Sequence, residues 1–374
     1  MNVLKMSILI LIMALTGCRK DKVLPIEKIS NTLKSSYDAS NRKQWLNIPN
    51  GFASFVQLDY NLDGNDDIIQ FEGYDLSLKY NWPSPQFYSG TPLTQANVSV
   101  SDKRIFASKM ITGDLDQNGF PDVFLISGMD PDNNCPTCEA PLLPNHIMFN
   151  IDGKSFIVKS LEVTATWSTA SAGDIDGDGD LDIVAFNTSH GKGRLNQLLI
   201  NDGKGKFIVR KSGIDLLEWV DRAELIDINK DGKLDLVMND VINTPNYTNR
   251  FRILWGNGSD FTENNSIRIE IPNDMRLLDI DAYDFDKDGY SELVLPMNYL
   301  YGNWKLFVYK TINNTTYVNS NMIESNTILS SRLIPYNELI SINDVDGNNK
   351  MDVFVNDKKV NLRWEFDTDK LKLK

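Results

Sequence analysis

The stretch "GDIDGDGDLDIVAFN", from Gly173 to Asn187, carries five aspartates in its first ten residues. Carboxylates this close in sequence repel one another, and an apolar run typical of a β-strand follows them directly. A folded protein can keep such a segment only if something offsets the repulsion.

Five further copies of this acidic segment occur in the chain. All six share the pattern D-x-[DN]-x-[DN]-G-x-x-[DE], with Asn349 in place of the glycine in the last copy. We call these segments acidic loops one to six and number the residues of each from position 1 to position 9. They occupy residues 59–67, 114–122, 174–182, 227–235, 284–292 and 344–352. Successive loops begin 53 to 60 residues apart, and an internal repeat of this length indicates stacked or radial modules.

Short apolar segments surround every acidic loop in the same order. Position 2 is always apolar, and position 10 begins a run rich in β-branched and aliphatic residues, such as "IVAF" at 183–186. A third apolar segment follows in most copies, then a hairpin turn such as "NDGKGKF" at 201–207, and then a fourth segment. Four short strands in a unit of this length are typical of a propeller blade. We therefore expect an all-β fold, a β-propeller of four-stranded blades.

The acidic loop, the apolar strand after it and the "NDGKGKF" hairpin together resemble the FG-GAP/VCBS repeat family, which includes the propellers of integrin α-subunits. The resemblance covers about residues 50–366. It implies that each acidic loop binds calcium and joins the first and second strands of a blade, so that all six acidic loops lie on one face of the ring. Rings in this family usually have seven blades.

The residues outside the six loops bear on the number of blades. Those before residue 59 and after residue 344 together suffice for one repeat and a short tether. We therefore expect six blades, the last built from three C-terminal strands and one strand from around Trp45 to Asn50 that closes the ring. A ring of seven blades, one of them without an acidic loop, is the alternative.

The spacing of the acidic residues predicts calcium sites. Calcium takes about six to eight oxygen ligands in flexible geometry. Side chains at positions 1, 3 and 5, the carbonyl of position 7 and the carboxylate of position 9 can supply them, and glycine at position 6 permits a left-handed backbone. The candidate ligands are Asp59, Asn61, Asp63, Asn65 and Asp67 in loop one; Asp114, Asp116, Asn118, Phe120 and Asp122 in loop two; Asp174, Asp176, Asp178, Asp180 and Asp182 in loop three; Asp227, Asn229, Asp231, Lys233 and Asp235 in loop four; Asp284, Asp286, Asp288, Tyr290 and Glu292 in loop five; and Asp344, Asp346, Asn348, Lys350 and Asp352 in loop six.

Two similar loops do not fit this pattern. An EF-hand loop closes with a glutamate at position 12 between helices, and dockerin loops form a close pair that leads into helices. Metal-free surface turns are the remaining alternative, because Asp, Asn and Gly favour turns by themselves. Up to six calcium ions would offset most of the net charge of −13. Loops three and five have four ligand carboxylates each and are expected to bind calcium most tightly.

Long loops rich in aromatic residues are expected on the face opposite the acidic loops. They include 74–92 and 127–146. Rigid aromatic side chains on scaffolded loops suit the binding of a glycan or a protein, although each could instead pack between blades. The candidate ligand-binding residues are Trp82, Trp167, Trp219, Tyr247, Tyr299 and Trp304.

The N-terminal segment predicts export and a lipid anchor. Residues 1–17 have a basic start and a short apolar stretch, as in a signal peptide. "LTGC", ending at Cys18, resembles the lipobox of bacterial lipoproteins, which implies lipidation of Cys18 and, with Arg19 after it, the outer membrane. We expect a tether over residues 18–40 and a single propeller domain over 41–374. Cys135 and Cys138 in "CPTC" are expected to form a local disulfide, with a redox-active pair as the alternative.

Composition and motifs separate the classes of function. The net charge of −13 argues against nucleic acid as a partner, because phosphate backbones require basic surfaces. The chain has two histidines and none of the nucleophile-elbow, metalloprotease or P-loop motifs. We therefore expect a calcium-stabilised, membrane-anchored binding or adhesion module for a glycan or an extracellular or envelope protein. A polysaccharide-degrading lyase or hydrolase, or a structural subunit of an envelope complex, is the alternative.

Overall fold

The structure is a computed structural model, and it describes part of the chain. The described residues are 54–65, 67–71, 85–90, 94–101, 109–126, 144–164, 167, 169–186, 196–217, 220, 222–242, 248–271, 275–299, 304–313, 316–324, 340–343, 352–356, 361–367 and 370–373. Nearly all regular structure among them is β-strand, with one short 3-10 helix, η1 (Gly213–Leu216). No helix within these ranges has the length and apolar character needed to cross a membrane.

The described strands form six sheets, which we number in chain order. Sheet one contains β1 (Ser54–Leu58), β2 (Asp67–Phe71), β3 (Gln86–Ser89) and β4 (Thr94–Ala96). Sheet two contains β5 (Ser99–Val100), β6 (Lys109–Gly113), β7 (Asp122–Ile126), β8 (Pro144–Asn150) and β9 (Ser155–Thr164). Sheet three contains β10 (Thr169–Gly173), β11 (Asp182–Phe186), β12 (Gln197–Ile200) and β13 (Ile208–Arg210).

The second half of the chain repeats this plan. Sheet four contains β14 (Ala223–Ile226), β15 (Asp235–Ile242), β16 (Thr248–Gly256) and β17 (Phe261–Glu270). Sheet five contains β18 (Met275–Leu277), β19 (Asp281–Tyr283), β20 (Glu292–Tyr299), β21 (Trp304–Asn313) and β22 (Thr316–Glu324). Sheet six contains β23 (Ile340–Asn343), β24 (Asp352–Asn356), β25 (Asn361–Asp367) and β26 (Lys370–Leu373).

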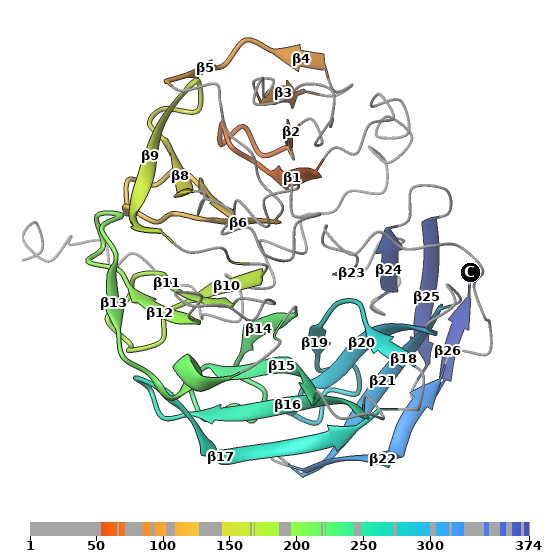
Figure 1. The fold of residues 1–374 in the computed structure, drawn as a ribbon. Helices are drawn as coiled ribbons and strands as arrows, with labels where there is room; N and C mark the ends of the chain where they lie inside the picture. Colours follow the sequence, from red (N-terminus) through yellow and green to blue (C-terminus); the bar gives the residue numbers. More distant parts are fainter. Residues whose placement is uncertain are drawn as a thin grey trace, which may run out of the picture.

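Each sheet is an antiparallel meander that runs outward from the centre of the molecule (Figure 1). In sheet three, for example, Thr169 pairs with Phe186 and Gly173 with Asp182 across β10 and β11. Sheet two differs at its outer edge, where β5 pairs in parallel with β9. The radial arrangement of meanders confirms the prediction of an all-β propeller.

Our expectation for the last sheet was wrong in one respect. We expected its fourth strand to come from around Trp45 to Asn50, but all four strands of sheet six lie within residues 340–373. The innermost strand is β23, directly before acidic loop six. Residues 45–50 lie outside the described part of the chain.

The hydrophobic core lies between neighbouring sheets. Four buried clusters join sheets one and two, two and three, three and four, and four and five. The position 2 residue of an acidic loop belongs to each cluster: Tyr60, Leu115, Ile175 and Ile228. In these four loops the packing explains the apolar residue at position 2, since it anchors the loop in the core beside the next sheet.

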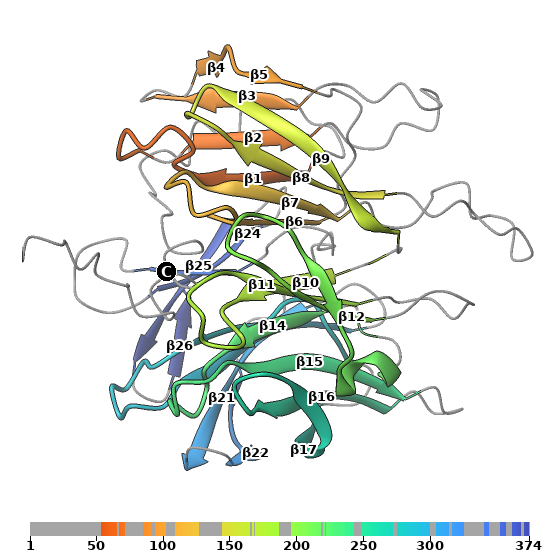
Figure 2. The ribbon, with the colours of Figure 1, turned by 90° about the vertical axis from the view of Figure 1, so that its left-hand side faces the viewer.

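The acidic loops and the turns between third and fourth strands lie at one end of the sheets, because strands alternate in direction along each meander. Figure 2 shows the loops between β1 and β2 and between β10 and β11 on the left-hand face of the molecule. The expectation that the acidic loops share a face agrees with this view. The same face therefore gathers the carboxylates of successive sheets.

Candidate metal centre

Five of the six acidic loops fall within the described residues, apart from Asp66 in loop one. They connect β1 to β2, β6 to β7, β10 to β11, β14 to β15 and β19 to β20. Loop six falls between β23 and β24, and residues 344–351 lie outside the described part, as does the side chain of Asp352.

The backbone of each described loop wraps around the carboxylate at position 1. In loop two, the N–H of Asn118 donates to Oδ1 of Asp114 at 3.0 Å, and the N–H of Gly119 donates to Oδ2 at 2.9 Å. The corresponding bond from the position 6 glycine measures 2.8 to 3.1 Å in the other four loops. Position 1 is therefore held in place by its own loop before any ligand binds.

Two positions of each described loop have a left-handed backbone. The position 6 glycines have φ between 84° and 98°, as predicted. Position 4 also has positive φ, with values of 55° to 61° at Leu62, Gln117, Lys230 and Lys287 and 78° at Gly177. We missed position 4, although glycines 177 and 347 at that position in loops three and six were a signal in the sequence.

The carboxylate at position 9 joins its loop to the third strand of the sheet. Asp182 is fully buried; its Oδ2 accepts the N–H of Ile175 at 3.1 Å, and its Oδ1 accepts the N–H of Asn201 at 3.0 Å. The equivalent acids of loops two and four accept the same pair of bonds. Burial raises the pKa of the position 9 acid to about 7 in all five loops: Asp67, Asp122, Asp182, Asp235 and Glu292.

Three loops bring carboxylates together as a metal site requires. In loops two, three and five, ligand oxygens of positions 1, 3 and 9 lie within 4.8 Å of one another. The groups are Asp114, Asp116 and Asp122; Asp174, Asp176 and Asp182; and Asp284, Asp286 and Glu292. Loops one and four have an asparagine at position 3, Asn61 and Asn229, which offers an amide oxygen in place of the carboxylate.

Position 5 lies outside these three groups. Asp178 and Asp288 are exposed, and each accepts a hydrogen bond from the backbone N–H of position 7, at 3.2 and 2.8 Å. The predicted ligands of positions 1, 3 and 9 therefore converge, whereas the position 5 side chain turns toward its own backbone, as in an Asx turn.

Buried carboxylate oxygens without hydrogen bonds mark loops three and one. In loop three, Oδ1 of Asp176 and Oδ1 of Asp180 are buried with no partner, and burial raises the pKa of Asp180 to about 6. In loop one, both carboxylate oxygens of Asp67 are buried. The Ser89 hydroxyl near Asp67 lowers the pKa of that acid without offsetting the effect of burial. Such oxygens are costly to bury, and a cation would satisfy them.

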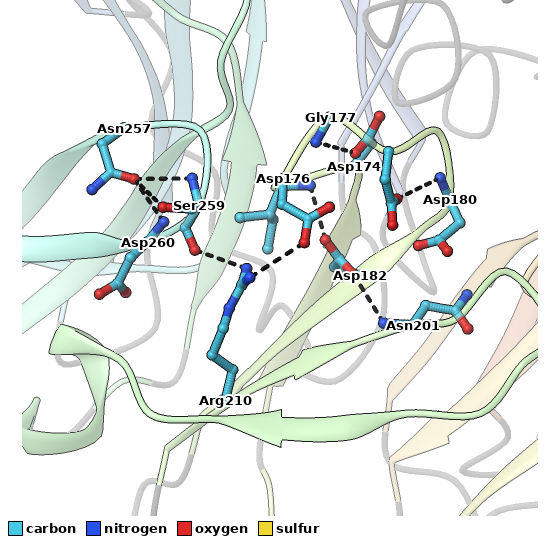
Figure 3. A network of polar contacts seen from close by, with 12 residues as sticks. Asp174, Asp176, Gly177, Asp180, Asp182, Asn201, Arg210, Asn257, Ser259 and Asp260 are labelled. Atoms are coloured by element: carbon cyan, nitrogen blue, oxygen red, sulfur yellow. Dashed lines mark hydrogen bonds and ion pairs between the residues drawn. The ribbon is translucent and has the colours of Figure 1, made fainter.

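Basic side chains approach the acids of loops three and five. Arg210 on β13 places its guanidinium 3.2 Å from Oδ2 of Asp176 (Figure 3). Lys310 on β21 places Nζ 2.8 Å from Oδ2 of Asp286, and Lys230 of loop four places Nζ 3.7 Å from Oδ2 of Asp284.

Buried asparagines at the ends of the third strands of sheets two and three bind the acidic loop of the preceding sheet. The side-chain amide of Asn201 donates to the carbonyl of Leu115 in loop two at 2.8 Å and to that of Leu181 in its own loop at 3.2 Å. Asn150 makes the equivalent bonds to Tyr60 at 2.7 Å and Pro121 at 3.2 Å. We interpreted Asn201 only as a hairpin residue, because the sequence does not show which sheet lies beside the turn.

The predicted ligand face is mostly outside the described part. Trp167 is the exception, and its placement corrects our expectation. It is fully buried and stacks on Phe124 with a centroid distance of 6.2 Å, in the core between sheets two and three. The side chains of Trp82, Trp219, Tyr247, Tyr299 and Trp304 are outside the described part, as are Cys18, Cys135 and Cys138.

Comparison with known proteins adds three findings. The family model described as FG-GAP-like repeat matches residues 114–185, 174–238 and 227–295. A "T-cell immunomodulatory protein homolog" of Plasmodium yoelii yoelii is 29% identical over 136 residues, which are 33% of this chain and 19% of that protein. The crystal structure of AofleA from Arthrobotrys oligospora aligns with a TM-score of 0.41 at 7% identity, covering 91% of each chain.

Proposed function

We propose that this chain, whose FG-GAP-like repeats form a β-propeller, is a calcium-stabilised ring of six blades that acts as a binding module for a glycan or an envelope protein. The buried carboxylate oxygens of loop three that lack hydrogen bonds are the observation that carries the calcium part. The binding part is supported by the aromatic loops that the sequence assigns to the opposite face. The number of blades is supported by the six sheets among the described strands.

The donor set of the acidic loops fits calcium. It consists of carboxylate, amide and carbonyl oxygens without nitrogen or sulfur, which hard cations prefer. In loop three, Asp174, Asp176 and Asp182 offer oxygens within 4.8 Å of one another, and Oδ1 of Asp176 has no other partner. In loop one, Asp67 offers two buried oxygens. Bound calcium would neutralise these acids and hold the first two strands of each sheet together.

Thermal unfolding with and without calcium tests this role. Because a ligand that binds only the folded state stabilises it by mass action, we expect a strong chelator to lower the melting temperature by several degrees and added calcium to restore it. An Asp174→Asn variant should lose part of this response, whereas Lys204→Gln, an exposed change in the same sheet, should keep it. An identical melt of the wild-type protein in chelator and in calcium would refute structural calcium.

A glycan and protein array, with calcium present and absent, tests the binding role. We expect retention of a ligand without turnover, and loss of retention when Trp82 or Trp304 is replaced by alanine. Release of reducing ends or unsaturated sugars would instead support the lyase or hydrolase alternative. Stable partners recovered from solubilised membranes would support a structural subunit.

We also propose that lipid on Cys18 anchors the chain in the outer membrane of a Gram-negative cell. The residue after the cysteine, Arg19, is the basis for choosing the outer membrane. The support is the "LTGC" segment after an apolar stretch. Labelled palmitate should enter the wild-type protein and not Cys18→Ala, and the labelled protein should fractionate with outer membranes. Release of the wild-type protein as an unlipidated soluble form would refute the anchor.

A further inference from the structure

The two acidic loops with the most ligand carboxylates are those that basic side chains reach. Loops three and five have acids at positions 1, 3, 5 and 9, whereas loop two has Asn118 at position 5 and loops one and four have asparagine at position 3. Arg210 pairs with position 3 of loop three and Lys310 with position 3 of loop five. Among the described residues, no such ion pair reaches Asp116, the position 3 acid of loop two.

Arg210 is fixed at both ends of its guanidinium. One amino group contacts Oδ2 of Asp176 at 3.2 Å, and the other donates to the carbonyl of Ser259 in the neighbouring sheet at 2.8 Å (Figure 3). The turn that carries Ser259 is closed by Asn257, whose side-chain oxygen accepts the N–H groups of Ser259 and Asp260, both within 2.9 Å. The arginine therefore sits between acidic loop three and a preformed turn of sheet four, with a third of its side chain exposed.

Lys310, on the third strand of its sheet, pairs with the position 3 acid of loop five as Arg210 does in loop three. Its Nζ lies 2.8 Å from Oδ2 of Asp286, on a side chain that is 27% exposed. Lys230 reaches Asp284 of the same loop from the preceding sheet at 3.7 Å. Two of the three clustered acids of loop five thus have a lysine beside them, and the third, Glu292, is buried at the end of the loop.

We propose that Arg210 and Lys310 are built-in counter-cations of the two loops with four ligand carboxylates, and that they weaken calcium binding there. Each supplies one positive charge beside the position 3 carboxylate, so calcium must either share that carboxylate with the basic side chain or displace the side chain from it. The net charge of these loops therefore approaches that of the loops with three acids. The advantage of loops three and five over loop two, which comes from their fourth carboxylate, is then largely removed. This inference rests on the proposal that the acidic loops bind calcium.

Calcium titration against a chromophoric chelator tests the proposal with Arg210→Gln, Lys310→Gln and the control Lys204→Gln, which removes an exposed lysine charge from sheet three. A partly exposed ion pair contributes up to about 1 kcal/mol, so we expect one binding step to become about three- to fivefold tighter in each of the first two variants. The control should bind as the wild-type protein does. Wild-type affinities in both Arg210→Gln and Lys310→Gln would overturn the proposal.

Melting in chelator separates this inference from the calcium proposal itself. Without metal, Arg210→Gln and Lys310→Gln should melt below Lys204→Gln, because the loop loses its counter-charge. Placing Arg210→Gln in an Asp176→Asn background should abolish most of its effect, whereas a cost that persists there would assign the arginine to its Ser259 contact and overturn the counter-cation role. If the wild-type protein binds no calcium, the calcium proposal fails, and these melts alone decide whether the basic residues neutralise the loops.

Discussion

Replacing Asn201 by alanine should destabilise the propeller by breaking a connection between sheets two and three. The side-chain amide of Asn201 is almost fully buried and donates to two carbonyls, those of Leu115 and Leu181. A buried acceptor that loses its donor costs about 1–3 kcal/mol. With two acceptors affected, we expect the free energy of unfolding to fall by about 2–4 kcal/mol, and the melting temperature to fall by at least about 4 °C.

The assay is thermal and denaturant unfolding of Asn201→Ala beside Lys204→Ala, an exposed change three residues further along the same turn. The loss should appear equally in calcium and in chelator, because the amide contacts carbonyls and not the loop carboxylates. Asn150→Ala should cost a similar amount, since it makes the equivalent bonds to Tyr60 and Pro121. Because the two asparagines join different pairs of sheets, their effects should add.

If the melting temperatures of Asn201→Ala and Lys204→Ala both lie within about 1 °C of that of the wild-type protein, the reasoning is refuted. The carbonyls of loops two and three would then find other donors, and the asparagine would serve only its turn. A loss seen in calcium but absent in chelator would also contradict it, because that pattern belongs to a metal ligand.

Three further predictions concern the acidic loops and the core beside them. Burial raises the pKa of Asp122 and Asp182 in the folded state to about 7, above the unfolded value, so ionisation of these acids destabilises the metal-free fold increasingly from about pH 4 to pH 7. In chelator, the melting temperature should therefore rise as the pH is lowered from 8 to 5. A higher melting temperature at pH 8 than at pH 5 would contradict this. Trp167→Ala removes a fully buried side chain that stacks on Phe124 and should lower stability by about 3–5 kcal/mol in denaturant titration, where an unchanged midpoint would place the indole outside the core. Gly119 has a φ of 92°, and a methyl group added there would meet no atom within 4 Å. Gly119→Ala should therefore lower the free energy of unfolding by about 1–3 kcal/mol through backbone strain alone. Denaturant titration, with Lys204→Ala as the reference, measures this loss.

Much of this fold could be predicted because its signals are local. The spacing of aspartates, asparagines and glycines specifies a turn whose backbone wraps around position 1, and the apolar run from position 10 specifies a strand. These features depend on residues within one loop, and six copies at a regular interval imply a radial assembly. The apolar residue at position 2 likewise predicts its own burial, which the structure shows in loops one to four. The sequence by itself thus determined the propeller and a ligand set that includes the acids at positions 1, 3 and 9, which converge in loops two, three and five. The shared face of the acidic loops was implied by the resemblance to the FG-GAP/VCBS repeat family.

Only the tertiary structure decided how one sheet acts on the loop of another. Asn201 lies 86 residues from the carbonyl that it binds in loop two, and Arg210 lies 34 residues from Asp176 and 49 from Ser259. Trp167 has the polarity and size expected of a surface ligand site, yet the approach of sheet two to sheet three buries it on Phe124. Counting carboxylates within a loop gives its own charge, but the field that a metal ion meets also depends on cations from other strands, and their positions are set by the packing of the sheets.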